Sequence, residues 1–146
     1  MRNIDLIVVH CSATREGIDV PVGIIRMWHK ERGFRDIGYH FVIGVDGVIH
    51  KGRNIDIPGA HAKGYNANSV GVCYVGGLDS EGNPKDTRTT AQIHALRGII
   101  SAIKSLVGED IKVVGHRDLS VDLNGDGAIS KNEWIKACPC FEISEL

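Results

Sequence analysis

The sequence predicts an α/β (α+β) fold in which a mixed central β-sheet is flanked by helices. Short apolar strand patterns and longer helical patterns are intermingled along the chain rather than grouped. Several strand patterns are apolar enough to indicate that both faces of the sheet are covered. No repeat, low-complexity segment or linker divides the 146 residues, so we expect one domain, residues 1–146.

The first half of the chain supplies a strand, a helix and a hairpin. Residues 4–9 (IDLIVV) are mostly β-branched and continuous, as in a buried strand. Residues 21–33 (PVGIIRMWHKERG) predict a helix with Pro21 in its first turn and Gly33 just past its end. Residues 39–52 alternate around Asp46-Gly47, which is a hairpin signal.

The second half adds two strands and the longest helix. Residues 69–77 (SVGVCYVGG) and 111–116 (IKVVGH) read as strands. The helix between them has Thr89 or Thr90 as its cap and Gly108 as its terminator. Its expected apolar face consists of Ile93, Leu96, Ile100, Ile103, and Leu106 or Val107.

Composition narrows the class of partner. The net charge is −1, which gives no indication of nucleic acid or an anionic membrane as the main partner. The apolar run near the N-terminus is broken by Asp5 and ended by His10, too soon for a signal peptide or a membrane-inserted helix. We therefore expect synthesis in the cytoplasm without a signal peptide, and any export by another route.

Three residues have the types and places of a metal site. His10 and His116 each end a predicted strand, and side chains at strand ends project toward the mouth of a sheet. Two histidines and a cysteine such as Cys138 would leave the fourth zinc position open, as catalytic sites do. On spacing alone a histidine is more often an ordinary surface or core residue, and Cys140, in the same CPC stretch, is a rival thiol.

A second metal motif lies between the last two candidate ligands. Residues 122–133 (DLNGDGAISKNE) follow the ligand order of a calcium-binding EF-hand loop. The ligands would be Asp122, Asn124, Asp126, the Ala128 carbonyl, Ser130 and Glu133. The same letters also fit a plain turn and a short helix, because SKNE is a capping box with Ser130 as N-cap.

Four stretches, VVHCSAT, RMWHKERGFRDIGYHFVI, HAKGYNANSVGVCYVGGLD and KACPCF, together resemble the zinc-dependent N-acetylmuramoyl-L-alanine amidases. These are the phage-lysozyme-like branch of the fold shared with peptidoglycan recognition proteins. The resemblance runs from about residue 4 to residue 142. It implies that His10, His116 and Cys138 bind zinc and that Tyr39 and Lys136 complete the active site.

The resemblance implies hydrolysis of the amide that joins the lactyl group of N-acetylmuramic acid to L-alanine in peptidoglycan. Zinc would lower the pKa of a bound water, and Lys136 could stabilise the developing oxyanion. The Tyr39 phenol could orient the water, relay a proton or bind the same oxyanion. We expect a monomer that acts on the cell wall after release or non-classical export; the alternative is a non-catalytic peptidoglycan-binding module.

The stretch HAKGYNANS is expected to line the substrate cleft. His61, Lys63, Tyr65 and Asn66 would supply donors to peptide carboxylates and carbonyls. Without the resemblance, a simple polar loop would be the better reading. Cys11 follows a candidate ligand on a strand, so its side chain is expected on the opposite face.

The sequence departs from the family pattern between His116 and Cys138. The 21 intervening residues, 138 − 116 − 1, exceed the short connection of the phage-like relatives and include the calcium-type loop at 122–133. We interpret that loop as an insertion in an amidase. Calcium would then order a following helix that presents Lys136 and Cys138 to the zinc.

Overall fold

A five-stranded sheet forms the centre of the computed structural model, which describes residues 1–146. Its spatial order is β4-β3-β5-β1-β7, and every neighbouring pair is parallel except β3 with β4. The strands are β1 (Leu6–Cys11), β3 (Phe41–Ile43), β4 (Ile49–Lys51), β5 (Ser69–Tyr74) and β7 (Lys112–Gly115). Two short strands, β2 (Thr14–Arg15) and β6 (Gly77–Leu78), pair separately. The prediction of a mixed sheet is confirmed.

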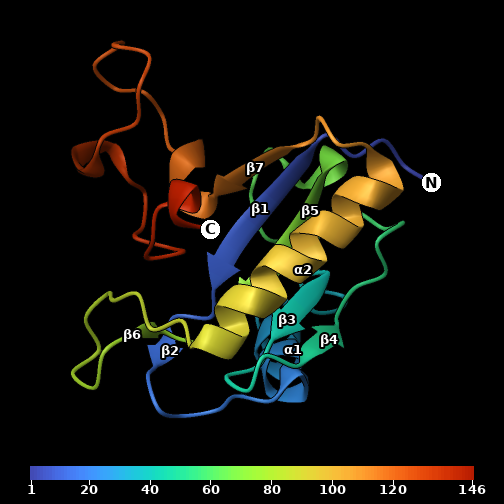
Figure 1. Ribbon diagram of the computed structural model, residues 1–146, viewed down its shortest axis with the longest axis vertical. Coiled ribbons are helices and arrows are strands. Elements are labelled where there is room, and N and C mark those ends of the chain that lie inside the picture. The colour runs from blue at the N-terminus through green and yellow to red at the C-terminus, as the bar shows by residue number, and fades with distance from the viewer.

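Two helices cover opposite faces of this sheet (Figure 1). α2 (Thr90–Val107) packs Leu96 and Ile100 against a cluster that includes Val72 of β5. α1 (Val22–Glu31) packs Ile25 into a smaller cluster with Cys73, the next residue along β5. Successive strand residues point to opposite faces, so apolar residues on both faces explain the continuous apolar patterns in the sequence.

The longest helix begins as the sequence predicts and carries one polar anchor that was not predicted. Thr89 is the N-cap: its Oγ1 accepts from the Gln92 amide at 3.1 Å, and the Gln92 side chain accepts from the Thr89 amide at 3.0 Å. Gln92 is fully buried and also donates to the Val75 carbonyl at 2.9 Å. At the other end Val107, rather than the exposed Leu106, packs on the core.

The first helix and the hairpin also match their predicted positions. Pro21 occupies the N-cap position of α1, one residue before the helix, and Gly33 follows its end with a φ of 94°. The hairpin joins β3 to β4 through Asp46-Gly47, where Gly47 adopts a φ of 83° that favours glycine. Neither α1 nor α2 has the combination of length and apolar character needed to cross a membrane.

The chain after β7 contains only 3-10 turns: η2 (His116–Leu119), η3 (Lys131–Glu133) and η4 (Ile143–Glu145). The prediction that a helix presents Lys136 and Cys138 is therefore wrong. The Ser130–Glu133 capping box forms, but the turn ends at Glu133, and the next residue, Trp134, is extended. The residue directly before a proline disfavours helical backbone. Between Glu133 and Pro139 there are therefore too few residues for a stable helix.

Candidate metal centre and active site

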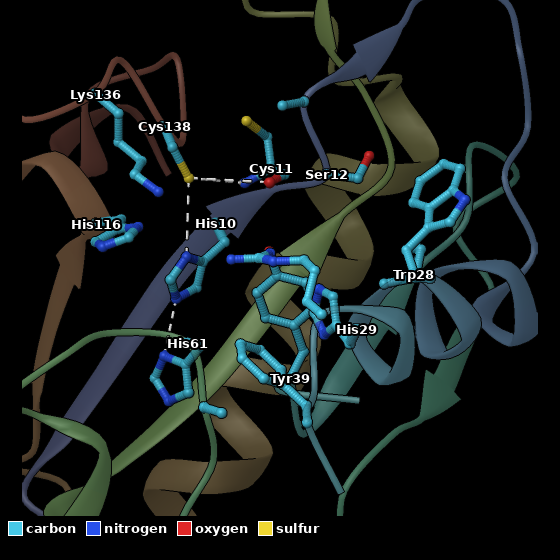
Figure 2. A pocket seen from close by; sticks show the side chains of 15 residues that line it. His10, Cys11, Ser12, Trp28, His29, Tyr39, His61, His116, Lys136 and Cys138 are labelled. Carbon is cyan, nitrogen blue, oxygen red and sulfur yellow. Dashed lines mark hydrogen bonds between the residues drawn. The ribbon is translucent and has the colours of Figure 1, made fainter. Parts of the chain in front are cut away.

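Neighbouring strands bring the two candidate histidines to one edge of the sheet. His10 lies near the end of β1, and His116 directly follows β7, the parallel neighbour of β1. Cys138 approaches from the irregular C-terminal segment (Figure 2). One potential ligand atom from each residue lies within 4.8 Å of the other two. The structure thus brings together three residues, of which the first and the last, His10 and Cys138, are more than 100 positions apart in the chain.

The donor set fits a zinc ion. Nδ1 of His10 lies 3.8 Å from Sγ of Cys138, and tetrahedral zinc with ordinary bond lengths would hold such a pair about 3.6 Å apart. The amide of Cys11 donates to the same sulfur at 3.2 Å, which fixes the sulfur beside His10. Cys140 is outside the cluster, and its Sγ lies 3.9 Å from that of Cys11.

The environment keeps both imidazoles neutral, the form that binds metal. Burial, reinforced by neighbouring His61, lowers the pKa of His10 well below its ordinary value. Burial and the positive charge of Lys136 lower the pKa of His116 to about 4. A buried charge without a partner is costly, so each ring retains a lone pair at neutral pH.

Tyr39 and Lys136 lie on the walls of a cavity of about 380 Å³ beside the three ligands. The Tyr39 ring centroid is 5.1 Å from that of His10, and burial raises the pKa of its phenol well above the ordinary value. The phenol is therefore a hydrogen-bond donor at neutral pH. Figure 2 shows the Lys136 amine extending toward the space between His116 and Cys138.

A few specific bonds hold the C-terminal segment against the sheet. The Arg117 amide donates to the Cys138 carbonyl at 2.8 Å, and the Tyr74 hydroxyl donates to the Pro139 carbonyl at 2.6 Å. The Arg117 guanidinium lies 3.9 Å over the Trp134 ring and pairs with Glu142 at 2.6 Å. No sequence pattern indicated Arg117 or Tyr74, because these contacts depend on the path of an irregular segment.

A second cavity, of about 540 Å³, contains the predicted substrate residues. Lys63 and Tyr65 are exposed on its wall, and Asn66 lies beside them. The Asn66 side-chain oxygen accepts from the amides of His61 and Ala62 at 2.9 and 3.0 Å, which fixes the shape of the loop. The cavity also includes Arg32, Phe34, Leu119 and Ile135, none of which sequence reasoning identified.

His61 differs from the other three predicted substrate residues because its ring is buried. One ring nitrogen lies 2.9 Å from Nε2 of His10, and the other lies 3.2 Å from Oγ of Ser69. Both nitrogens therefore have partners inside the protein. A substrate-binding role for His61 stays a prediction, although in this structure neither nitrogen is free.

The calcium-type loop is closed by its own hydrogen bonds. The Asp122 carboxylate accepts from the amides of Gly125 and Gly127 at 2.9 and 2.8 Å. The Glu133 carboxylate accepts from the amides of Leu123 and Ser130 at 2.9 and 2.7 Å. The carboxylates of the loop do not gather into a ligand set of the kind that His10, His116 and Cys138 form. The turn and its capping box are confirmed, and calcium binding stays a prediction.

A mixed α/β fold with two histidines, a cysteine, a lysine and a tyrosine around one cavity is the arrangement expected of a metal-dependent hydrolase. The sequence profile of the N-acetylmuramoyl-L-alanine amidase family matches residues 1–139. The chain therefore belongs to this family of enzymes, as the resemblance of its motifs implied.

Phage endolysins are among its relatives. The chain is 44% identical over 137 residues to the endolysin of Klebsiella phage KP32, covering 94% of this chain and 81% of that protein. It is 42% identical over 135 residues to the endolysin of Enterobacteria phage K11, covering 92% of this chain and 80% of the relative. Both alignments span most of each protein.

Solved structures confirm the fold. The N-acetylmuramoyl-L-alanine amidase LysC from Clostridium intestinale superposes with a TM-score of 0.71 at 26% identity, covering 94% of this chain and 77% of LysC. Bumblebee PGRP-SA superposes with a TM-score of 0.73 at 26% identity, covering 95% and 77% of the two chains. The predicted fold, shared by amidases and peptidoglycan recognition proteins, is confirmed.

Proposed function

We propose that this amidase cleaves the bond between the lactyl group of N-acetylmuramic acid and L-alanine in peptidoglycan, with zinc held by His10, His116 and Cys138. The convergence of these three side chains within 4.8 Å carries the proposal. The family match supports it. The C-terminal part of the chain supplies only one thiol to the cluster, so Cys138 rather than Cys140 is the proposed ligand.

Zinc, when bound, supplies the Lewis acidity that activates water for attack on an amide carbonyl. The protein's own groups handle the charge that develops. The Lys136 ammonium faces the ligand cluster and would stabilise the oxyanion of the tetrahedral state. We assign the Tyr39 hydroxyl, whose ring centroid lies 5.1 Å from that of His10, as a second donor to that oxygen.

The neighbouring cavity fits the stem peptide of the substrate. Lys63 and Arg32 bring positive charge to its wall, and stem peptides carry carboxylates. Tyr65 is 44% exposed and offers an aromatic face and a hydroxyl beside them. Asn66, whose oxygen is used within the loop, would contact substrate through its amide nitrogen. Charge complementarity would orient the peptide so that its first amide reaches the metal.

We further propose that residues 1–146 form one domain that works as a monomer, and that the protein acts on the cell wall. The endolysin relatives support this placement, because they match over most of their length. The loop at 122–133 is then an insertion at the edge of the domain.

One experiment tests the central proposal. Purified protein is assayed for zinc by elemental analysis, and peptidoglycan digested with it is analysed by mass spectrometry. The expected result is about one zinc per chain and release of stem peptides with a free L-alanine amino group. Binding of muropeptides without zinc and without cleavage would instead identify a peptidoglycan-binding module.

A further inference from the structure

The His10 ring uses its two nitrogens for different purposes. Nδ1 faces Sγ of Cys138 at 3.8 Å, and Nε2 lies 2.9 Å from Nδ1 of His61. A neutral imidazole carries one proton, so only one nitrogen offers a lone pair. For Nδ1 to bind a metal, the proton must be on Nε2, and Nε2 must donate to His61.

This requirement propagates through His61 to Ser69. If Nδ1 of His61 accepts from His10, its own proton is on Nε2, which then donates to Oγ of Ser69 at 3.2 Å. The reversed chain, with the Ser69 hydroxyl as first donor, would place a proton on Nδ1 of His10 and block the metal position. The three residues therefore form a relay with two possible directions, of which one is competent for metal.

The position of the His61 ring is sterically defined. A Cβ on Gly71 would lie 2.6 Å from Cδ2 and Cγ of His61, and a Cβ on Gly59 would lie 2.6 Å from Cδ2. Only glycine at both places allows the ring to enter. The loop that carries His61 is fixed by Asn66, whose oxygen accepts from the His61 amide at 2.9 Å.

Water has little access to the relay. The exposed fractions are 1% for His10, 9% for His61 and 0% for Ser69. Losing the acceptor at His61 would therefore leave the Nε2–H group of His10 unpaired in a buried place, which costs free energy. That cost would favour the other His10 tautomer or a rotated ring.

We propose that His61 is a positioning residue that selects the metal-binding tautomer of His10 and fixes the orientation of its ring. This inference rests on the proposed zinc site but not on the identity of the cleaved bond. It assigns His61 to the metal centre rather than to the substrate cleft. Partners of this kind raise the basicity of a ligating histidine, and their loss weakens metal binding.

The test compares His61→Gln with His61→Leu. A glutamine oxygen can still accept from His10, whereas leucine fills similar space without an acceptor. Zinc affinity is measured by competition with a chelator, and circular dichroism establishes that each variant is folded. We expect His61→Leu to weaken zinc binding by about 10- to 100-fold and His61→Gln to lose no more than a few-fold. With zinc saturating, KM should stay near that of the wild type in both variants.

A second measurement does not depend on the variants folding. Nitrogen-15 NMR of the metal-free wild type reports which ring nitrogen of each histidine carries the proton. The expected result is a proton on Nε2 of both His10 and His61. Protonation of His10 at Nδ1 would overturn the proposal, as would unchanged zinc affinity in His61→Leu. A raised KM with normal zinc binding would return His61 to the substrate cleft. If His61→Leu weakens zinc binding while the zinc-loaded wild type fails to cleave muropeptides, the relay is upheld and only the proposed reaction is refuted.

Discussion

The two halves of the candidate site are held in place by different means. His10 belongs to β1, which is hydrogen-bonded on both sides, by β5 and by β7. Lys136 and Cys138 belong to an irregular segment fixed by single bonds, such as that from the Tyr74 hydroxyl to the Pro139 carbonyl at 2.6 Å. One half is therefore specified by strand register. The other depends on a few contacts of individual residues.

The largest effect is expected at the thiol of the irregular half. Cys138→Ser should abolish zinc retention and hydrolysis, because a hydroxyl is a far poorer zinc ligand than a thiolate. Cys140→Ser is the matched control and should keep most of both. Zinc content after dialysis and peptidoglycan hydrolysis are the measurements. The reverse pattern would transfer the ligand role to Cys140.

Replacing Lys136 should lower turnover and leave zinc binding unchanged. Lys136→Ala is expected to lower kcat about 100-fold or more with zinc still bound, as for the loss of an oxyanion stabiliser. Tyr39→Phe should act in the same direction and more mildly. Lys131→Ala, an exposed lysine in the same segment, is the control. Near-native turnover in Lys136→Ala would remove this residue from the mechanism.

The anchoring of the irregular half can be weakened without touching a ligand. Tyr74→Phe removes the donor to the buried Pro139 carbonyl and should lower the free energy of unfolding by about 1–3 kcal/mol. Tyr65→Phe, which changes an exposed phenol, should leave stability unchanged. Urea unfolding of both variants makes the comparison. Equal stability would show that the C-terminal segment is fixed by other contacts.

The free energy of unfolding should fall in acid because of a buried histidine next to the sheet. His40 directly precedes β3 of the central sheet and is buried. Burial lowers the pKa of His40 to about 4 from an ordinary 6.5, so the unfolded chain takes up a proton first as the pH falls. Stability should be constant above about pH 6.5 and fall between there and pH 4, by about 1.4 kcal/mol per pH unit for this group. In metal-free protein, His40→Asn should give a shallower slope in denaturant unfolding. An unchanged slope would locate the sensitivity in other histidines.

The smallest effect is expected at the loop 122–133. This prediction rests only on the order of ligand residue types in its sequence. With zinc saturating, calcium added to metal-stripped protein should raise the melting temperature and the activity. The stabilisation should be about 1.4 kcal/mol at a tenfold excess over Kd. Asp122→Ala combined with Asp126→Ala should remove both responses. No response in the wild type would leave the loop as a turn with a capping box.

The difference between the halves also explains what the sequence could predict. Apolar patterns located the strands and both helices, because periodicity reports burial directly. The proposed zinc ligands came from the resemblance of the motifs to the amidase family, and the structure brings them within 4.8 Å of one another. The contacts of Arg117 and Tyr74 did not, because they join distant positions through an irregular path that no local pattern encodes. His61 was predicted as a substrate-binding residue; its partner His10 lies 51 positions away, and only the structure brings the two rings together.

The bond from the Arg117 amide to the Cys138 carbonyl, 2.8 Å long, has an evolutionary consequence. It joins the two ends of the connection between His116 and Cys138. Doubling the length of a flexible closed loop costs only about 0.6 kcal/mol, so residues can be gained or lost between the two ends while the ligands stay in register. The connection is thus a tolerant place in the amidase scaffold, where lineages can diverge and where a designer could graft a wall-targeting peptide.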